Sequence, residues 1–266
     1  MGWRLPLKRT AIGRARPNGR MDAGWWRIEA GGTFCKMTRR QRLRYVFFCT
    51  VWMAICCTSF AAPHVVNAGV PGESSGEMAT RMGAALERYR PSLVVIFAGM
   101  NDAVNNLKFQ SPRQTMESVT AMVKRAQLAH AKVVLVNLHE PDERRLLARH
   151  KIENYGSIAP AERIRAVNRE LLEVSRQSKV PLADFHEALK QAGGANEAMS
   201  TDGVHLTARG YHLLAVTVLK ALPERLDEDA TVLCMGDSLT YGNGVRKPGR
   251  DEGNETYPAQ LQSLLR

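Results

Sequence analysis

Five short apolar runs without polar alternation constrain the fold of this chain more than any other feature. Each run has the length of a strand, and segments with helical spacing separate one run from the next. A strand without polar alternation is buried on both faces, and strands that alternate with helices form a parallel sheet between helical layers. The five runs are His64–Asn67, Leu93–Phe97, Lys132–Leu138, Val180–Phe185 and Thr231–Met235. We therefore predict one α/β sandwich domain over residues 63–266.

The positive charge of the chain is concentrated at its N-terminal end. Residues 1–44 hold twelve of the 37 lysines and arginines but only two of the 26 acidic residues, and so carry +10 of the formal net charge of +11. A basic leader on a neutral body indicates targeting. The body has no stripe of basic and aromatic residues, so we expect no nucleic-acid partner.

Residues 37–61 have the order of a secretory signal peptide. Four arginines between residues 39 and 44 precede an apolar run of sixteen residues, Tyr45–Phe60. Ser59 and Ala61 supply the small side chains of a cleavage site before Ala62. The alternative is an uncleaved N-terminal membrane anchor, although the run is short for a bilayer span. We interpret residues 1–36 as a basic, disordered extension that is translated only if Met1, and not Met37, is the start. The expected location is secreted, or in the periplasm or cell envelope.

Cysteine usage argues against disulfides and metal sites. Four of the five cysteines precede residue 62, and only Cys234 lies in the body. A single cysteine forms no internal disulfide, and no segment has metal-ligand spacing. We therefore expect no metal site.

Polar residues gather where the predicted strands end, which is where parallel sheets bind ligands. Gly236–Thr240 follows the last strand, and a serine in such a tight turn before a helix is exposed at the sheet edge. In Asp202–Leu206, a carboxylate can hold one imidazole nitrogen and leave the other for a serine. Gly69–Ser75 and Gly99–Asp102 supply glycines that permit close backbone approach and one amide donor, Asn101.

These four segments resemble the signature blocks of the SGNH/GDSL hydrolases, a family of serine esterases and lipases, and the resemblance covers the whole body. It implies Ser238 as nucleophile, His205 as base and Asp202 as the acid that orients His205. It also implies an oxyanion hole made by the N–H of Gly72, the N–H of Ser238 and the amide of Asn101. The implied fold is a three-layer α/β/α sandwich with a parallel, flavodoxin-like sheet, circularly permuted.

The permutation follows from the order of the blocks. The family begins with the serine block, whereas here that block comes last, at residues 236–240. Two alternatives stay open: residues 231–266 could begin a truncated second copy, or they could complete a neighbouring chain by swapping.

Other polar residues at the strand ends receive subsidiary roles. His139 follows the strand that ends at Leu138, and we predict that it lines the substrate cleft. Asp237, Thr240 and Asp102 are interpreted as supports of the turns rather than as chemical actors.

The sequence therefore predicts a serine esterase that forms an acyl-enzyme intermediate and works without a metal or cofactor. Its expected substrates are small-molecule, glycan or lipid esters, among them lipid acyl esters and carbohydrate acetyl esters. The alternative functions are a non-catalytic carbohydrate- or lipid-binding protein, or a form that is active only as an oligomer.

Overall fold

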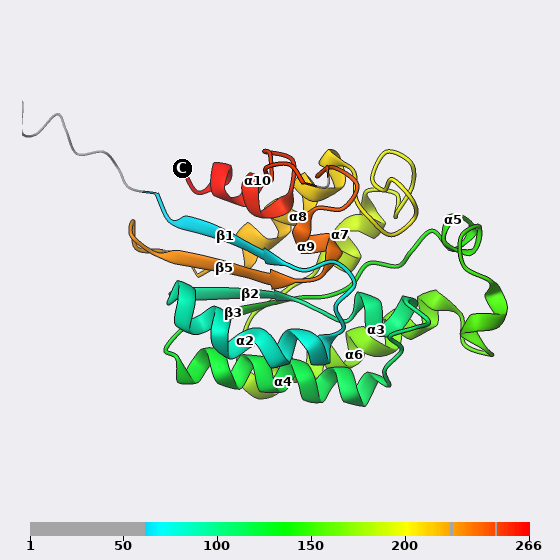
Figure 1. Ribbon diagram of the computed structural model, residues 1–266, viewed down its shortest axis with the longest axis horizontal. Helices are drawn as coiled ribbons and strands as arrows, with labels where there is room; N and C mark the ends of the chain where they lie inside the picture. Colours follow the sequence, from blue (N-terminus) through cyan, green and yellow to red (C-terminus); the bar gives the residue numbers. More distant parts are fainter. Residues whose placement is uncertain (1–61, 224–225, 248) are drawn as a thin grey trace, which may run out of the picture. The chain divides into compact units, whose positions relative to one another are not determined.

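Five parallel strands form one sheet in the order β1-β5-β2-β3-β4 (Figure 1). The computed structural model describes residues 62–223, 226–247 and 249–266; the predicted extension at 1–36 and signal peptide or anchor at 37–61 lie outside them. The strands are β1 (His64–Gly69), β2 (Leu93–Phe97), β3 (Lys132–Val136), β4 (Leu182–Ala183) and β5 (Thr231–Gly236). Every neighbouring pair is parallel. The last strand of the chain is therefore a central strand of the sheet.

Helices cover both faces of this sheet. Figure 1 shows α2 (Ser75–Tyr89), α4 (Pro112–Leu128) and α6 (Pro160–Ser178) on one face. On the other face lie α7 (Phe185–Gln191), α8 (Ala208–Ala221) and α10 (Tyr257–Leu264). The short elements α3 (Met100–Val104), α5 (Glu143–Leu147), η1 (Ile152–Tyr155) and α9 (Ser238–Tyr241) lie beyond the carboxyl ends of the strands. The predicted three-layer α/β/α sandwich is confirmed.

Local caps explain where the predicted and observed elements differ. Helix α2 begins at Ser75, because Ser74 and Glu77 form a reciprocal capping box. The predicted strand over 180–185 shortens to Leu182–Ala183, because Asp184 accepts a hydrogen bond from the Glu187 N–H and starts α7. Helix α4 also begins with a capping box, formed by Ser111 and Gln114.

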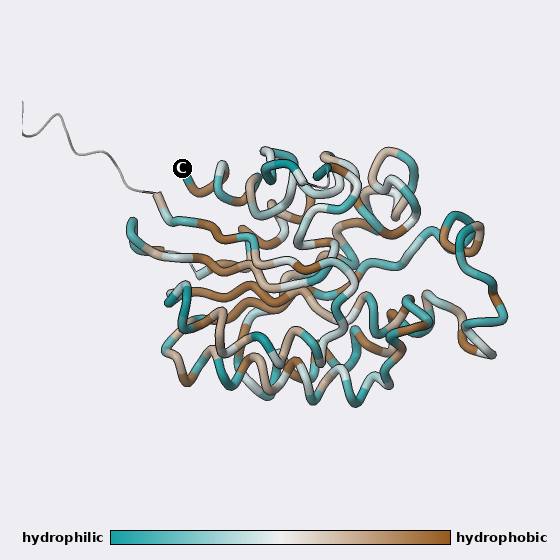
Figure 2. The backbone as a smooth tube through the Cα atoms, in the orientation of Figure 1, coloured by the Kyte–Doolittle hydropathy of each residue, from teal (hydrophilic) through white to brown (hydrophobic). Residues whose placement is uncertain are grey.

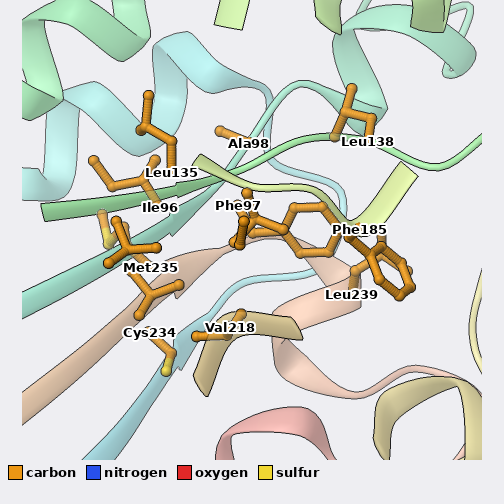
Figure 3. Packing of buried hydrophobic residues seen from close by; sticks show 14 of the residues in the cluster. Ile96, Phe97, Ala98, Leu135, Leu138, Phe185, Val218, Cys234, Met235 and Leu239 are labelled. Carbon is orange, nitrogen blue, oxygen red and sulfur yellow. The ribbon is translucent and has the colours of Figure 1, made fainter. Parts of the chain in front are cut away.

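The core lies on both faces of the sheet, where the strands are most apolar (Figure 2). All five residues of β2 are at most 1% exposed, and burial of each large apolar side chain contributes roughly 1.5–3 kcal/mol. At the end of β2, the ring of Phe97 meets Phe185 edge-on at 6.2 Å (Figure 3). The ring of Tyr257 meets Phe97 in the same way at 6.5 Å. This aromatic packing forms a rigid base under the strand ends.

The outer edge of β1 is covered by the C-terminal helix. The side-chain amide of Gln262 donates to the carbonyl of Pro63 at 2.7 Å and accepts from the N–H of Val65 at 2.8 Å. One amide side chain thus pairs a backbone carbonyl and a backbone N–H at the sheet edge, which would otherwise be free to bind a further strand. The same contact brings the end of α10 beside the start of β1.

Candidate active site

The turn after β5 presents Ser238 at the start of α9. Gly236 ends the strand, and a Cβ there would lie 2.0 Å from Thr240 Oγ1 and 2.9 Å from the carbonyl of Phe97. Asp237 then caps α9 by accepting a hydrogen bond from the Leu239 N–H at 2.8 Å. Only glycine fits at position 236, so the packing around Gly236 sets the sharp turn that carries Ser238. Ser238 is only 8% exposed, so the expectation of an exposed serine is wrong: the turn places it at the end of the sheet but neighbouring segments cover it.

Ser238, His205 and Asp202 form one hydrogen-bonded chain, which we call the triad. His205 Nε2 lies 3.0 Å from Ser238 Oγ, and His205 Nδ1 lies 2.7 Å from Asp202 Oδ2. The other carboxylate oxygen of Asp202 accepts from the N–H groups of Val204 at 2.9 Å and His205 at 2.7 Å. All three side chains belong to the same chain, so no second copy is needed for these contacts.

The carboxylate of Asp202 is held in its charged form. Burial alone would raise the pKa of Asp202, but its hydrogen bonds with His205, the charge of His205 and the N–H of Val204 together hold that pKa well below its usual value. A charged carboxylate on Nδ1 selects the tautomer whose Nε2 can accept a proton from the serine. The triad is therefore arranged for proton transfer from Ser238 to His205.

Asn101 lies beside the nucleophile turn, but its amide hydrogens already have acceptors. Asn101 Nδ2 donates to the carbonyl of Glu73 at 3.0 Å and to Asp237 Oδ2 at 3.1 Å. Gly72 adopts φ +82°, and the space into which a Cβ would point is open. Within the described residues, neither the Gly72 N–H nor the Ser238 N–H donates a hydrogen bond. Both hydrogens of the Asn101 amide therefore have acceptors, whereas the N–H groups of Gly72 and Ser238 have none among the described residues.

Two buried aspartates support the turns around Ser238. Burial raises the pKa of Asp237 to about 6, although the Leu239 N–H, the charge of His205 and the amide of Asn101 favour its charged form. Asp102 is fully buried and accepts hydrogen bonds from the N–H and hydroxyl of Ser75 and from the hydroxyl of Thr115. Neither aspartate hydrogen-bonds to Ser238 Oγ. The hydrogen bonds that each one accepts come from neighbouring turns, as a supporting residue requires.

Arg81 joins the two strands that flank the nucleophile, a role the sequence reasoning missed. Its Nη2 donates to the carbonyls of Ala68, at 2.9 Å, and Gly236, at 3.1 Å. Its Nε pairs with Glu73 at 2.6 Å, and the carbonyl of Glu73 in turn accepts from Asn101 Nδ2. The available signal was an arginine beside the core-facing Met78 and Met82 of α2, which indicates a polar contact at the sheet.

His139 lies behind the turn that carries His205 rather than on an open surface. Its side chain is 1% exposed, and Nε2 lies 2.9 Å from the carbonyl of Val204. Burial lowers the pKa of His139 to about 4, so the ring is neutral at neutral pH. His139 also lines a cavity of about 390 Å³ together with Glu140, His186 and Lys190. Its role in binding substrate stays a prediction.

Two kinds of feature are absent from the described part of the chain. No group of three or more histidine, cysteine or acidic residues there could hold a metal ion. No described helix is both long enough and apolar enough to cross a bilayer.

A serine, an imidazole and a carboxylate linked in this way at the end of a parallel sheet define the class of serine hydrolases. The chain belongs to the GDSL-like lipase/acylhydrolase family, whose family model matches residues 48–213, more than half of its length. The chain is therefore a hydrolase of the GDSL type. The matched residues end before β5, so they do not include Ser238.

Named relatives belong to the same group of enzymes. Esterase TesA of Pseudomonas aeruginosa is 31% identical over 141 residues, which make up 53% of this chain and 60% of the esterase. Thioesterase 1/protease 1/lysophospholipase L1 of Escherichia coli strain K12 is 24% identical over 62% of this chain and 70% of its own length. The crystal structure of a GDSL-like lipase from Bacteroides thetaiotaomicron is 22% identical with a TM-score of 0.49, covering 56% of this chain and 71% of that chain. The match thus spans less than two thirds of the Pseudomonas esterase.

Proposed function

We propose that this protein is a serine esterase that hydrolyses carboxylic esters through an acyl-enzyme intermediate. The observation that carries the proposal is the 3.0 Å contact between Ser238 Oγ and His205 Nε2, with Asp202 on the opposite nitrogen of the ring. The name of the Pseudomonas relative, an esterase, supports the same reaction.

In the proposed reaction, Ser238 Oγ attacks the ester carbonyl while its proton moves to His205 Nε2. The carbonyl oxygen becomes an oxyanion that receives hydrogen bonds from the N–H groups of Gly72 and Ser238. The amide of Asn101 joins them when the oxyanion replaces the carbonyl of Glu73 as its acceptor. When the intermediate collapses, the C–O bond breaks and His205 protonates the leaving alcohol. Water then repeats the sequence, and the acid is released.

The proposed substrates are lipid acyl esters or carbohydrate acetyl esters. An enzyme that carries an export signal meets such esters outside the cytoplasm, which favours them over cytoplasmic thioesters. We propose that residues 37–61 act as this signal and that the protein works in the periplasm, in the envelope or outside the cell. N-terminal sequencing of the processed protein should then begin at Ala62, whereas an intact N-terminus in a membrane fraction would indicate an anchor.

Hydrolysis of a short-chain aryl ester tests the proposed reaction. Ser238→Ala should lower kcat/KM by about 10³-fold or more, because the nucleophile is removed. The matched control is Ser263→Ala, since Ser263 lies on the exposed face of α10 and bonds only to the carbonyl of Ala259. A fluorophosphonate should label the wild-type protein once and leave Ser238→Ala unlabelled. Equal activity in Ser238→Ala and the wild type would contradict the proposal, and absent hydrolysis and labelling would favour a binding protein.

We also propose that the domain is circularly permuted relative to its family. If β5 is counted first, the strand order β1-β5-β2-β3-β4 becomes 2-1-3-4-5, which is the flavodoxin-like order. The family match, which ends before β5, and the Gln262 contact between α10 and the start of β1 support the same interpretation.

Relocating the chain ends tests this permutation. A variant that joins residue 266 to residue 62 by a short linker, and is opened in the link between α8 and β5, should fold and keep its activity. A variant that fails to fold would contradict the permutation. Mixing Ser238→Ala with His205→Ala chains should restore no activity, because each triad lies within one chain. Restored activity would indicate swapping instead.

A further inference from the structure

The catalytic carboxylate has a second cationic partner outside the family's signature blocks. Arg149 Nη1 lies 2.9 Å from Asp202 Oδ2, and Arg149 Nη2 donates to the backbone carbonyl of Asp202 at 3.0 Å. Asp202 Oδ2 is the same oxygen that lies 2.7 Å from His205 Nδ1. One carboxylate oxygen is therefore shared between a guanidinium and the imidazole of the triad.

Arg149 is brought to this point by α5 and the turns beside it. The N–H of Asp142 donates to the carbonyl of Gly203 at 2.9 Å, and Arg145 Nη1 donates to the carbonyl of Ser200 at 2.9 Å. Gly203 has φ +91°, and a Cβ there would lie 2.8 Å from the carbonyl oxygen of Asp142. The segment therefore packs directly on the turn that carries Asp202 and His205. Figure 1 shows α5 beyond the end of the sheet.

We propose that Arg149 is a positioning residue of the triad, which fixes Asp202 against His205 and balances part of the carboxylate charge. The inference rests on the proposed function, because it concerns the residue that would act as the base. Asp202 stabilises the protonated ring of His205, and a second cation on the same oxygen weakens that stabilisation. Loss of Arg149 should therefore strengthen the stabilisation that Asp202 gives to the protonated ring of His205.

Other charged or titratable groups also surround Asp202 and His205, and their charges act on His205 together with that of Arg149. These groups are Asp237 beyond the serine, His139 and Tyr211 behind the turn, and Arg145 on α5. Within the described residues, Arg149 is the only lysine or arginine in ion-pair contact with Asp202. Its side chain is 43% exposed, so water screens the interaction and a moderate effect is expected.

A titration of His205 followed by NMR tests this role without requiring ester hydrolysis. In Arg149→Gln the titration midpoint of His205 should rise by about half a pH unit, because the opposing cation is lost. Arg149→Lys keeps the charge without the paired geometry and should recover most of the shift. The matched control is Arg165→Gln, which breaks an exposed 3.0 Å ion pair with Glu140 and should leave the midpoint unchanged.

The kinetic readout should move in parallel. The acidic limb of kcat/KM in Arg149→Gln should shift to higher pH by the same amount, with a loss of about 3- to 10-fold near pH 6. An unshifted midpoint in folded Arg149→Gln would overturn the inference, and so would an equal shift in Arg165→Gln. If Ser238→Ala kept full activity, the proposed function would fail, whereas the titration would still decide whether Arg149 sets the basicity of His205.

Discussion

The turn that carries Ser238 is fixed by the sheet, whereas the turn that carries Asp202 and His205 is fixed by polar side chains. The first follows a strand paired on both sides, and Gly236 leaves no room for another residue. The second lies outside the sheet, and Ser200 crosses it by accepting from the Gly203 N–H and donating to the His205 carbonyl. Substitution of Gly236 in the first turn should therefore cost mainly stability, and substitution of Asp202 in the second should cost mainly activity.

The largest expected effect is on catalysis, in the polar turn. Asp202→Asn should lower kcat/KM by about 10³- to 10⁴-fold, because a neutral amide neither selects the required tautomer of His205 nor stabilises its charge. The free energy of unfolding should change far less. Asp184→Asn is the control, since Asp184 is an exposed helix cap away from the triad and should leave kcat/KM unchanged. A large fall in the free energy of unfolding of Asp202→Asn, with little change in kcat/KM, would contradict this prediction.

The next effect is on stability, in the turn that the sheet fixes. Gly236→Ala should lower the free energy of unfolding by about 3 kcal/mol or more, because the methyl group would overlap Thr240 and the carbonyl of Phe97. Urea denaturation measures this loss. Gly83→Ala is the matched control, because its Cβ meets nothing within 4 Å in helix α2, and it should stabilise by about 0.5–1 kcal/mol. Equal stability of the two variants would contradict the assigned role of Gly236.

Asp237 in the first turn and His139, which contacts the Val204 carbonyl of the second, are buried titratable groups that should give opposite pH dependence. His139 has a folded pKa of about 4, below its unfolded value, so its contribution to stability is lost as pH falls from about 6.5 to 4. Asp237 has a folded pKa of about 6, above its unfolded value, so its contribution is lost as pH rises from about 4 to 6. Each contribution is on the order of 2–3 kcal/mol.

Single substitutions should expose these opposite slopes. Between pH 4.5 and 6, the stability of His139→Gln should fall with rising pH relative to the wild type, and that of Asp237→Asn should rise. His212→Gln is the control, because His212 is exposed on α8. Thermal unfolding across this range gives the slopes, and two variants with slopes of the same sign would refute the assignment.

The smallest expected effect comes from the crossing hydroxyl. Ser200→Ala should cost about 1–2 kcal/mol, because the Gly203 N–H loses its acceptor and the His205 carbonyl loses a donor in a site that is 1% exposed. Because the turn then loosens around His205, kcat/KM should also fall by a few fold. Ser263→Ala again serves as the exposed control, and no change in either quantity would show that the turn does not depend on Ser200.

The sequence predicts the sheet well because buried parallel strands leave an unmistakable local pattern. β2 and β5 are continuous apolar runs, and the polar segments follow them directly. Asp202 and His205 are three residues apart, so their contact is a local property of one turn. The catalytic roles of these residues stay predictions until Ser238→Ala is measured.

The parts that the sequence does not predict depend on contacts between distant segments. Arg149 reaches Asp202 across 53 residues, and Arg81 reaches Gly236 across 155. The place of Arg81 beside Met78 and Met82 indicates a polar contact at the sheet but not its partner, and the spacing around Arg149 indicates no partner at all. In the same way, the residues near Asn101 do not indicate that the carbonyl of Glu73 and the carboxylate of Asp237 would occupy its amide. Short polar elements such as α5 lack the apolar periodicity that marks the longer helices.

The central position of β5 has a consequence for synthesis of the protein on the ribosome. β1 and β2 are translated more than 130 residues before the strand that pairs with both of them. Until Thr231–Gly236 emerges, the edges of β1 and β2 that will face β5 have no strand to pair with. The nucleophile leaves the ribosome in the same late segment. Closure of the sheet and arrival of Ser238 are therefore a single late event, and a chain interrupted before residue 231 has neither a complete sheet nor a serine at the site.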